Sequence, residues 1–348
     1  MNKQQLAQAG EFYDDNFSRA RHFCDEMRKL VETLIASEGI NIHSVSGRVK
    51  ERDSFLKKCE KDKYSDVEQI TDLVGVRVIT YILEDVEKVC KLIENEFTVD
   101  DANSVDKSVS LKENEMGYLS VHYILRLSGR RCDLPEHRAY SGMCFEIQIR
   151  TLLQHAWAEF SHDKNYKFAG VLDSKTNRSF FITAGALELI DAEFQRISDA
   201  ISKYEEAVKE KTAEGDLDSI EINSTSLLEY LNGRFKSSKL QKSFNGCDEK
   251  IVRELKDFGL NTISDIDAIV PKDLDGHIEK LVDDRRANYL GLLRLVLIIA
   301  DAEKYFRECW KEHWHRFAKG AADLVRSYGI DLDKLDGEYH FGIEGDQK

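Results

Sequence analysis

The sequence predicts a domain with a mixed β-sheet flanked by helices (class α/β or α+β), followed by an all-helical C-terminal domain. Hydrophobic residues make up 42% and charged residues 33% of the 348 residues, with only two prolines. This composition is typical of a globular, helix-rich protein. Strand patterns alternate with helix patterns between residues 40 and 165, which favours one α/β domain. From about residue 176 the pattern is entirely helical.

The expected elements follow from the spacing of the apolar residues. Strands are predicted at 43–50, 73–82, 117–127 and 144–151, and helices at 11–37, 51–61, 84–97 and 152–163. The segment 73–82 is rich in β-branched residues, as strands are. In the segment 144–151, apolar residues alternate with Glu146, Gln148 and Arg150. A period of two indicates a strand with one face in the core.

The chain divides into two predicted domains with a linker between them. The α/β domain is expected over residues 1–210, the polar segment 211–226 reads as a linker, and the helical domain is expected over 227–348. Ser226 and Glu229 have the spacing of a capping box, so we expect the first helix of the second domain to begin there.

Charge and cysteine content exclude several classes of protein. A formal net charge of −14 argues against a surface coated by nucleic acid. The seven cysteines contain no CxxC pair, which suggests reduced thiols and neither a disulfide framework nor a zinc site. The N-terminus lacks the apolar stretch of a signal peptide. The most apolar run, 289–300, is too short for a membrane span and contains Arg294. We therefore expect a cytoplasmic protein without a membrane partner.

Phosphate binding, if present, must come from side chains. The sequence contains neither the GxxxxGK[ST] nor the GxGxxG pattern, so a P-loop and a Rossmann phosphate cradle are not expected. The basic candidates in the α/β domain are Arg48, Lys50, Lys57, Lys58, Arg77 and Arg150.

Two acids in strand-like segments are candidates for a metal site. Asp72 and Glu146 come from separate strands, and two carboxylates facing one cleft would suit Mg²⁺. The alternative for Asp72 is a cap or turn acid. Glu146 lies in the middle of a strand, where a carboxylate is costly to desolvate unless it is paired or used. Taken alone, the row that begins at Glu146 is more typical of a solvated strand face.

A third group shares one face of the strand at 117–127. Tyr118, Ser120 and His122 alternate with apolar residues. An aromatic ring in line with a hydroxyl and an imidazole would stack on a base and contact a phosphate. The alternative is an ordinary half-exposed strand.

Together these segments match a known family in order and spacing. The blocks "SVSGRVK", "TDLVGVRVI", "GYLSVHY", "EIQIRT", "HAWAE" and "NYK" resemble the synthetase domain of the RelA/SpoT-type (p)ppGpp synthetases over roughly residues 43–168. The resemblance implies a nucleotidyltransferase-like fold. It also implies a Mg²⁺-dependent GTP pyrophosphokinase that moves the β,γ-pyrophosphate of ATP to the ribose 3′-hydroxyl of GTP or GDP. Because only about 40 residues precede this region, the hydrolase domain of the long relatives is not expected.

The resemblance assigns roles to residues of this chain. The implied metal-binding and catalytic residues are Asp72 and Glu146, with Glu146 helping to deprotonate the 3′-hydroxyl. The implied ATP-binding residues are Arg48, Lys50, Ser54, Lys57, Lys58 and Arg77. The implied acceptor-binding residues are Tyr118, which would stack on guanine, and His122, Gln148, Arg150 and Asn165. His122 and Arg150 would reach phosphates.

One departure from the family pattern leaves the acceptor open. Leu119 stands where relatives often carry a polar residue next to the guanine-stacking tyrosine. A toxin-type relative that pyrophosphorylates the 3′ CCA end of tRNA, in a toxin–antitoxin or anti-phage system, is the alternative, although the acidic charge weighs against tRNA. An inactive nucleotide-sensing module is a third hypothesis. The helical domain carries no catalytic pattern, so we expect it to serve regulation, a homo-oligomer or a partner.

Overall fold

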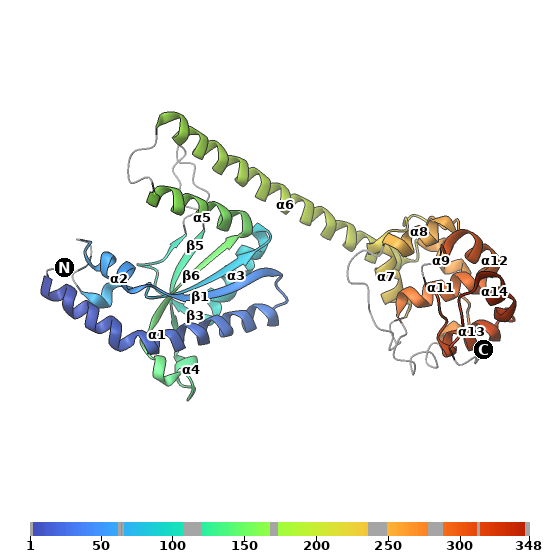
Figure 1. Cartoon of the computed structure of the whole chain (residues 1–348), viewed down its shortest axis with the longest axis horizontal. Helices are drawn as coiled ribbons and strands as arrows, with labels where there is room; N and C mark the ends of the chain where they lie inside the picture. Colours follow the sequence, from blue (N-terminus) through green and yellow to red (C-terminus); the bar gives the residue numbers. More distant parts are fainter. Residues whose placement is uncertain are drawn as a thin grey trace. The chain divides into compact units, whose positions relative to one another are not determined.

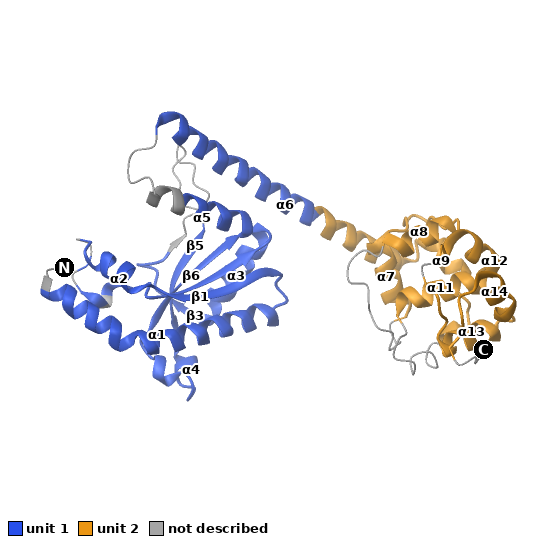
Figure 2. Cartoon of the chain, in the orientation of Figure 1, with its two compact units in different colours: residues 1–199 blue, residues 200–348 orange. Residues whose placement is uncertain are grey.

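The chain forms two compact units, residues 1–199 and residues 200–348 (Figure 2). The structure is a computed structural model, and it describes residues 3–61, 64, 66–106, 120–167, 173–235, 249–277, 288–311 and 314–344. The first unit is built on a mixed β-sheet, and the second is helical (Figure 1). This confirms the predicted fold class. The domain limits at 210 and 227 stay a prediction.

The first unit alternates helices and strands in the predicted order. Its helices are α1 (Lys3–Ser37), α2 (Arg52–Cys59), α3 (Leu83–Glu96), α4 (Gly129–Cys132), α5 (Leu152–Lys167) and α6 (Ser174–Glu214), which continues into the second unit. Its strands are β1 (Ile42–Val49), β2 (Val74–Thr80), β3 (Phe97–Val99), β4 (Val105–Asp106), β5 (Val121–Leu127) and β6 (Cys144–Thr151). Two short 3-10 turns, η1 (Val67–Gln69) and η2 (Arg138–Tyr140), complete it.

The sheet brings distant parts of the chain side by side. Its order is β1-β2-β6-β5-β3, with β4 paired to β5. The pair β2 and β6 is parallel, and the other pairs are antiparallel. Thr80 at the end of β2 pairs with Thr151 at the end of β6, 71 positions later in the sequence, so side chains of the two strands share one face of the sheet. The two central strands therefore carry the site.

The two faces of the sheet differ in chemistry. One face is apolar: Val76, Phe145 and Ile147 are buried there against Phe23 of α1 and Ile93 of α3. This packing explains why the odd-numbered positions of β6 are apolar, because side chains alternate across a strand. The opposite face carries polar residues on β1, β2, β6 and β5.

Strand register places these polar residues in two rows. Ser46 pairs with Arg77, Arg77 with Gln148, and Gln148 with His122. In the next row, Arg48 pairs with Gly75 and Gly75 with Glu146. Gly75 has no side chain, so space remains between the two charged residues that flank it.

The second unit is a compact helical domain. Its helices are α7 (Ser224–Arg234), α8 (Glu249–Asp257), α9 (Ile263–Ile269), α11 (Tyr289–Ala300), α12 (Ala302–Lys304), the π-helical turn η3 (Tyr305–Cys309), α13 (Lys319–Ser327) and α14 (Leu332–Tyr339). The apolar run 289–300 is the helix α11, and most of its side chains are buried in the core. Among the described residues, no helix combines the length and hydrophobicity that crossing a membrane requires.

The start of α7 differs from the sequence prediction. The N-cap is Asn223, whose side chain accepts hydrogen bonds from the backbone N–H groups of Thr225 and Ser226. The Ser226 hydroxyl accepts from the Asn223 N–H and donates to the Glu221 carbonyl. The predicted capping box of Ser226 with Glu229 is therefore wrong, because Ser226 is the third residue of the helix and closes the box from the other side.

Candidate active site

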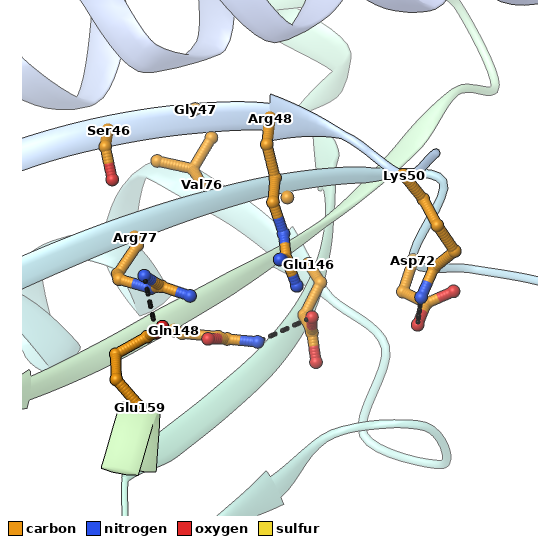
Figure 3. A pocket seen from close by; sticks show the side chains of 11 residues that line it. Ser46, Gly47, Arg48, Lys50, Asp72, Val76, Arg77, Glu146, Gln148 and Glu159 are labelled. Carbon is orange, nitrogen blue, oxygen red and sulfur yellow. Dashed lines mark hydrogen bonds and ion pairs between the residues drawn. The ribbon is translucent and has the colours of Figure 1, made fainter. Parts of the chain in front are cut away.

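The polar face of the sheet forms the floor of a cavity of about 290 Å³. Most of the lining comes from β1, β2 and β6, and Glu159 comes from α5 (Figure 3). The lining residues are Ser46, Gly47, Arg48, Lys50, Asp72, Gly75, Val76, Arg77, Glu146, Gln148 and Glu159. Cations and carboxylates thus alternate around a space that is large enough for the phosphates of a nucleotide.

Glu146 lies near the middle of this floor and is held by two neighbours. The His122 ring contacts Glu146 Oε1 through Nδ1 at 3.0 Å, and Gln148 Nε2 donates to Oε2 at 2.9 Å. Burial acts to raise the pKa of Glu146, but the hydrogen bonds from His122 and Gln148 outweigh it and hold the pKa below its ordinary value. Glu146 is therefore an ionised carboxylate at neutral pH.

The contact with an ionised acid fixes the roles of the His122 nitrogens. A carboxylate only accepts hydrogen bonds, so Nδ1 must carry the proton that it donates to Glu146. In the neutral imidazole, Nε2 then accepts from the Ser120 hydroxyl, 2.7 Å away. Both ring nitrogens are thus used by protein groups. The predicted contact of His122 with a phosphate stays a prediction.

Asp72 lies in the turn before β2 and binds two lysines. Lys50 Nζ and Lys58 Nζ are 2.8 Å and 2.6 Å from Asp72 Oδ2. Burial acts to raise the pKa of Asp72, but these two ion pairs outweigh it and lower the pKa. Oδ1 is buried and has no hydrogen-bond partner within the described residues. Asp72 therefore keeps one oxygen for a further ligand.

A cluster of two arginines and a histidine lies at the α5 end of the cavity. It consists of Arg77, Arg150 and His155, and all three approach Glu159 Oε1, at 3.1, 3.6 and 3.7 Å. Burial, followed by the nearby charge of Arg77, lowers the pKa of Arg150 to about 10. Burial and the two arginines also lower the pKa of His155. We call this group the Arg77–Arg150–His155 cluster.

Most of the residues predicted for the site meet in this one place. Arg48, Lys50, Asp72, Arg77, Glu146 and Gln148 line the cavity, and Lys58, His122 and Arg150 contact residues that line it. Ser54 and Lys57 lie exposed on α2 and are not among the lining residues. Tyr118 and the side chain of Asn165 fall outside the described residues. The individual roles of all these residues stay predictions.

The sequence reasoning missed Glu159 and His155. Both belong to the block "HAWAE", which contributed to the resemblance but received no role. A signal was present: the two residues are four apart on a predicted helix, so they share one face directly after the strand that carries Glu146. Which face of α5 meets the sheet is decided by tertiary packing, and the sequence does not show it.

The oxygen atoms at the site suit a hard divalent cation. Within the described ranges, no three His, Cys, Asp or Glu residues are grouped as a metal site. Asp72 and Glu146 nevertheless line the same cavity, and Asp72 Oδ1 is unpartnered. Mg²⁺ is commonly bound by one or two carboxylates together with water and substrate phosphates. The residues present fit that pattern.

The α/β domain is similar to a known protein family. Residues 47–170 match a family model described as a region found in RelA / SpoT proteins. The match identifies a RelA/SpoT region in this part of the chain. The matched range contains every residue that lines the cavity except Ser46. The resemblance inferred from the sequence blocks is confirmed.

Two curated relatives come from Bacillus subtilis (strain 168). GTP pyrophosphokinase YjbM is 27% identical over 173 residues, which is 49% of this chain and 78% of that protein. GTP pyrophosphokinase YwaC is 28% identical over 131 residues, which is 36% of this chain and 59% of that protein. Both alignments leave more than half of this chain uncovered.

Among solved structures, the chain is similar to small alarmone synthetase 1 from Bacillus subtilis. The TM-score is 0.46 at 23% identity, and the match covers 56% of this chain and 99% of that chain. The same enzyme has also been solved bound to its product pppGpp, with a TM-score of 0.46 at 26% identity.

Proposed function

We propose that the RelA/SpoT domain transfers the β,γ-pyrophosphate of ATP to the ribose 3′-hydroxyl of GTP or GDP. The products are (p)ppGpp and AMP. The observation that carries the proposal is Glu146, an ionised carboxylate fixed by two hydrogen bonds in the middle of a cavity lined by cations. The names of the curated relatives, which are GTP pyrophosphokinases, support the same reaction.

The charges around the cavity suit this chemistry. Pyrophosphate transfer moves a polyanion, so catalysis depends on neutralising charge and on aligning donor and acceptor. Arg48, Lys50 and Arg77 line the cavity, while Lys58 and Arg150 contact carboxylates that line it. We assign the ATP phosphates to this set of cations.

Glu146 is suited to act as the general base. A base must lie within hydrogen-bonding distance of the hydroxyl that it deprotonates, and it must be ionised at the working pH. His122 and Gln148 orient the carboxylate from two sides, and Ser120 fixes the ring of His122 in turn. In this proposal, the 3′-hydroxyl of the acceptor lies against Glu146, and its proton passes to that carboxylate.

Asp72 and Glu146 would hold Mg²⁺ in this site. When bound, the ion would neutralise phosphate charge. Lys50 and Lys58 hold Asp72 through Oδ2, and Oδ1, which has no hydrogen-bond partner within the described residues, would be the oxygen available to the ion. This arrangement keeps the carboxylate ionised and oriented before any ligand arrives.

The substitution Glu146→Gln tests the proposal. It keeps the size of the side chain and removes the negative charge, so transfer should fall by at least about 100-fold. Purified protein is incubated with γ-labelled ATP and Mg²⁺, with GDP, GTP or bulk tRNA as competing acceptors. The exposed acid Glu87 on α3 provides the matched control, and Glu87→Gln should transfer normally. Circular dichroism checks that both variants are folded.

The acceptor that receives the label distinguishes the three candidate functions. Label in GTP or GDP supports the proposal, and label only in tRNA would replace the acceptor by the 3′ end of tRNA. Label in no acceptor, from a folded protein, would favour a nucleotide-sensing module. Near-normal transfer by Glu146→Gln would remove the carboxylate from the mechanism.

A further inference from the structure

The Arg77–Arg150–His155 cluster has less negative charge around it than its burial requires. Arg150 is only 4% exposed, yet its Nε and Nη2 atoms have no hydrogen-bond partner within the described residues. The same holds for Arg77 Nε. Buried charges are normally paired and hydrogen-bonded, because an unpaired one is expensive to desolvate. The cluster is therefore arranged to bind additional acceptor atoms.

Glu159 is an incomplete partner for the cluster. It meets both arginines and His155 through the same oxygen, and only the 3.1 Å contact with Arg77 is within hydrogen-bonding distance. Its side chain is 59% exposed. Solvent screens a carboxylate that is this exposed, so its contact with the arginines is weaker than that of a fully buried ion pair. Departure of the carboxylate into solvent is therefore opposed less than in a buried pair.

The placement of Glu159 allows it to leave without moving the backbone. It lies on α5 at the edge of the cavity, while Arg77 and Arg150 project from β2 and β6 (Figure 3 shows Arg77 and Glu159). Rotation of one exposed side chain is enough to release the cluster. His155, four residues earlier on the same helix, stays beside the arginines.

We propose that Glu159 is a displaceable counter-ion, which neutralises the Arg77–Arg150–His155 cluster in the free protein and is replaced there by the phosphate chain of a nucleoside triphosphate. This inference rests on the proposed function for the identity of the nucleotide. Glu159 sets a threshold for binding, because a ligand must offer the cluster more negative charge and more oxygen atoms than one carboxylate does. A pyrophosphate group meets that condition.

The same exchange would favour release of the spent donor. Transfer breaks the bond between the α- and β-phosphates of ATP and leaves AMP with one phosphate, while the pyrophosphate departs on the acceptor. Once no polyphosphate remains at the cluster, Glu159 can return to it. Glu159 would then compete with re-entry of AMP and favour the next ATP.

The test measures binding of inorganic pyrophosphate by isothermal titration calorimetry, without acceptor or turnover. Glu159→Gln removes the competing charge and keeps the shape, so the Kd should fall by about threefold to tenfold. Glu87→Gln removes the same charge from the exposed side of α3 and should leave the Kd unchanged. Glu159→Asp keeps the charge on a shorter side chain and should give an intermediate value.

A double variant shows whether Glu159 influences pyrophosphate binding through its contact with Arg150. With Arg150→Met in place, adding Glu159→Gln should no longer tighten pyrophosphate binding. An unchanged or higher Kd for Glu159→Gln would overturn the inference, as would an equal gain for Glu87→Gln. Because no acceptor is used, these results are independent of the labelling experiment. Normal transfer with no gain in pyrophosphate binding would reject this inference alone.

Discussion

Two arginine–glutamate contacts in this chain, each with at least one buried partner, are built in opposite ways. In the second unit, Glu254 is 1% exposed and accepts two hydrogen bonds from Arg294, at 2.9 and 2.5 Å. The Tyr305 hydroxyl adds a third, at 3.3 Å. In the first unit, Arg150 is as deeply buried but lies 3.6 Å from an exposed carboxylate, with two of its nitrogens unpartnered.

The difference separates an ion pair that holds the fold from one that is open to a ligand. Arg294 and Glu254 meet through two parallel contacts, the geometry in which a guanidinium and a carboxylate satisfy each other. Nothing further needs to bind there. Arg150 keeps hydrogen-bond donors available for an anion. This costs free energy, because a buried charge is left without full solvation or pairing. Three substitutions test this difference.

The largest effect is expected from Glu254→Gln. Removing one partner of a buried ion pair leaves the other charge uncompensated, which costs about 3–5 kcal/mol. The free energy of unfolding of the second unit, measured with urea, should fall by that amount. Arg253→Gln breaks the exposed pair with Glu249 on the same helix and should change it by less than about 0.5 kcal/mol. Equal effects of the two substitutions would contradict the assignment of Glu254 as structural.

An intermediate loss in the free energy of unfolding, which depends on pH, is expected from Asp72→Asn. The pKa of Asp72 is lowered in the folded state, since its ion pairs with Lys50 and Lys58 outweigh its burial. Its charge therefore stabilises the fold above the pKa of the unfolded chain, about 3.9, and this contribution is lost as the pH falls through the lower, folded pKa. At neutral pH the substitution should cost about 1.5–3 kcal/mol.

Unfolding curves measured from neutral to acidic pH check this prediction. The difference in free energy between the wild-type protein and Asp72→Asn should shrink as the pH falls. Asp101→Asn, at an exposed acid of the same unit, should show no such trend. A difference that stays constant with pH would mean that the charge of Asp72 does not stabilise the fold.

The smallest effect on stability is expected from Arg150→Met. The substitution removes a buried charge that has few partners, so the free energy of unfolding should change by no more than about 1 kcal/mol in either direction. Pyrophosphate binding should weaken by about tenfold or more, because hydrogen bonds from a charged donor are lost. A loss of stability as large as that of Glu254→Gln would make Arg150 a structural residue like Arg294.

Much of this architecture could be predicted because it is local. The period of two in β6 and the β-branched run of β2 follow from which face each strand buries, and both strands lie where they were expected. The row of Glu146, Gln148 and Arg150 was visible for the same reason. Its meaning was not, because a polar strand face looks the same whether it meets solvent or a ligand.

What the sequence could not supply depends on contacts between distant segments. The roles of Glu159 and His155 require knowing which side of α5 faces the sheet. The partners of His122 require the register of β5 against β6. The cap at Asn223 was missed because asparagine and serine are both favoured at the N-cap position. Only the backbone conformation shows whether Asn223 or Ser226 precedes the helix.

The register of the sheet also determines where this site tolerates change. Ser46, Arg77, Gln148 and His122 stand in one row only because four strands are aligned residue for residue. Shifting one strand by a single residue would turn its polar side chains into the core and its apolar ones into the cavity. Insertions in the connecting loops leave the row intact. The lengths of the loops should therefore vary among relatives far more freely than the spacing of residues within β1, β2, β5 and β6.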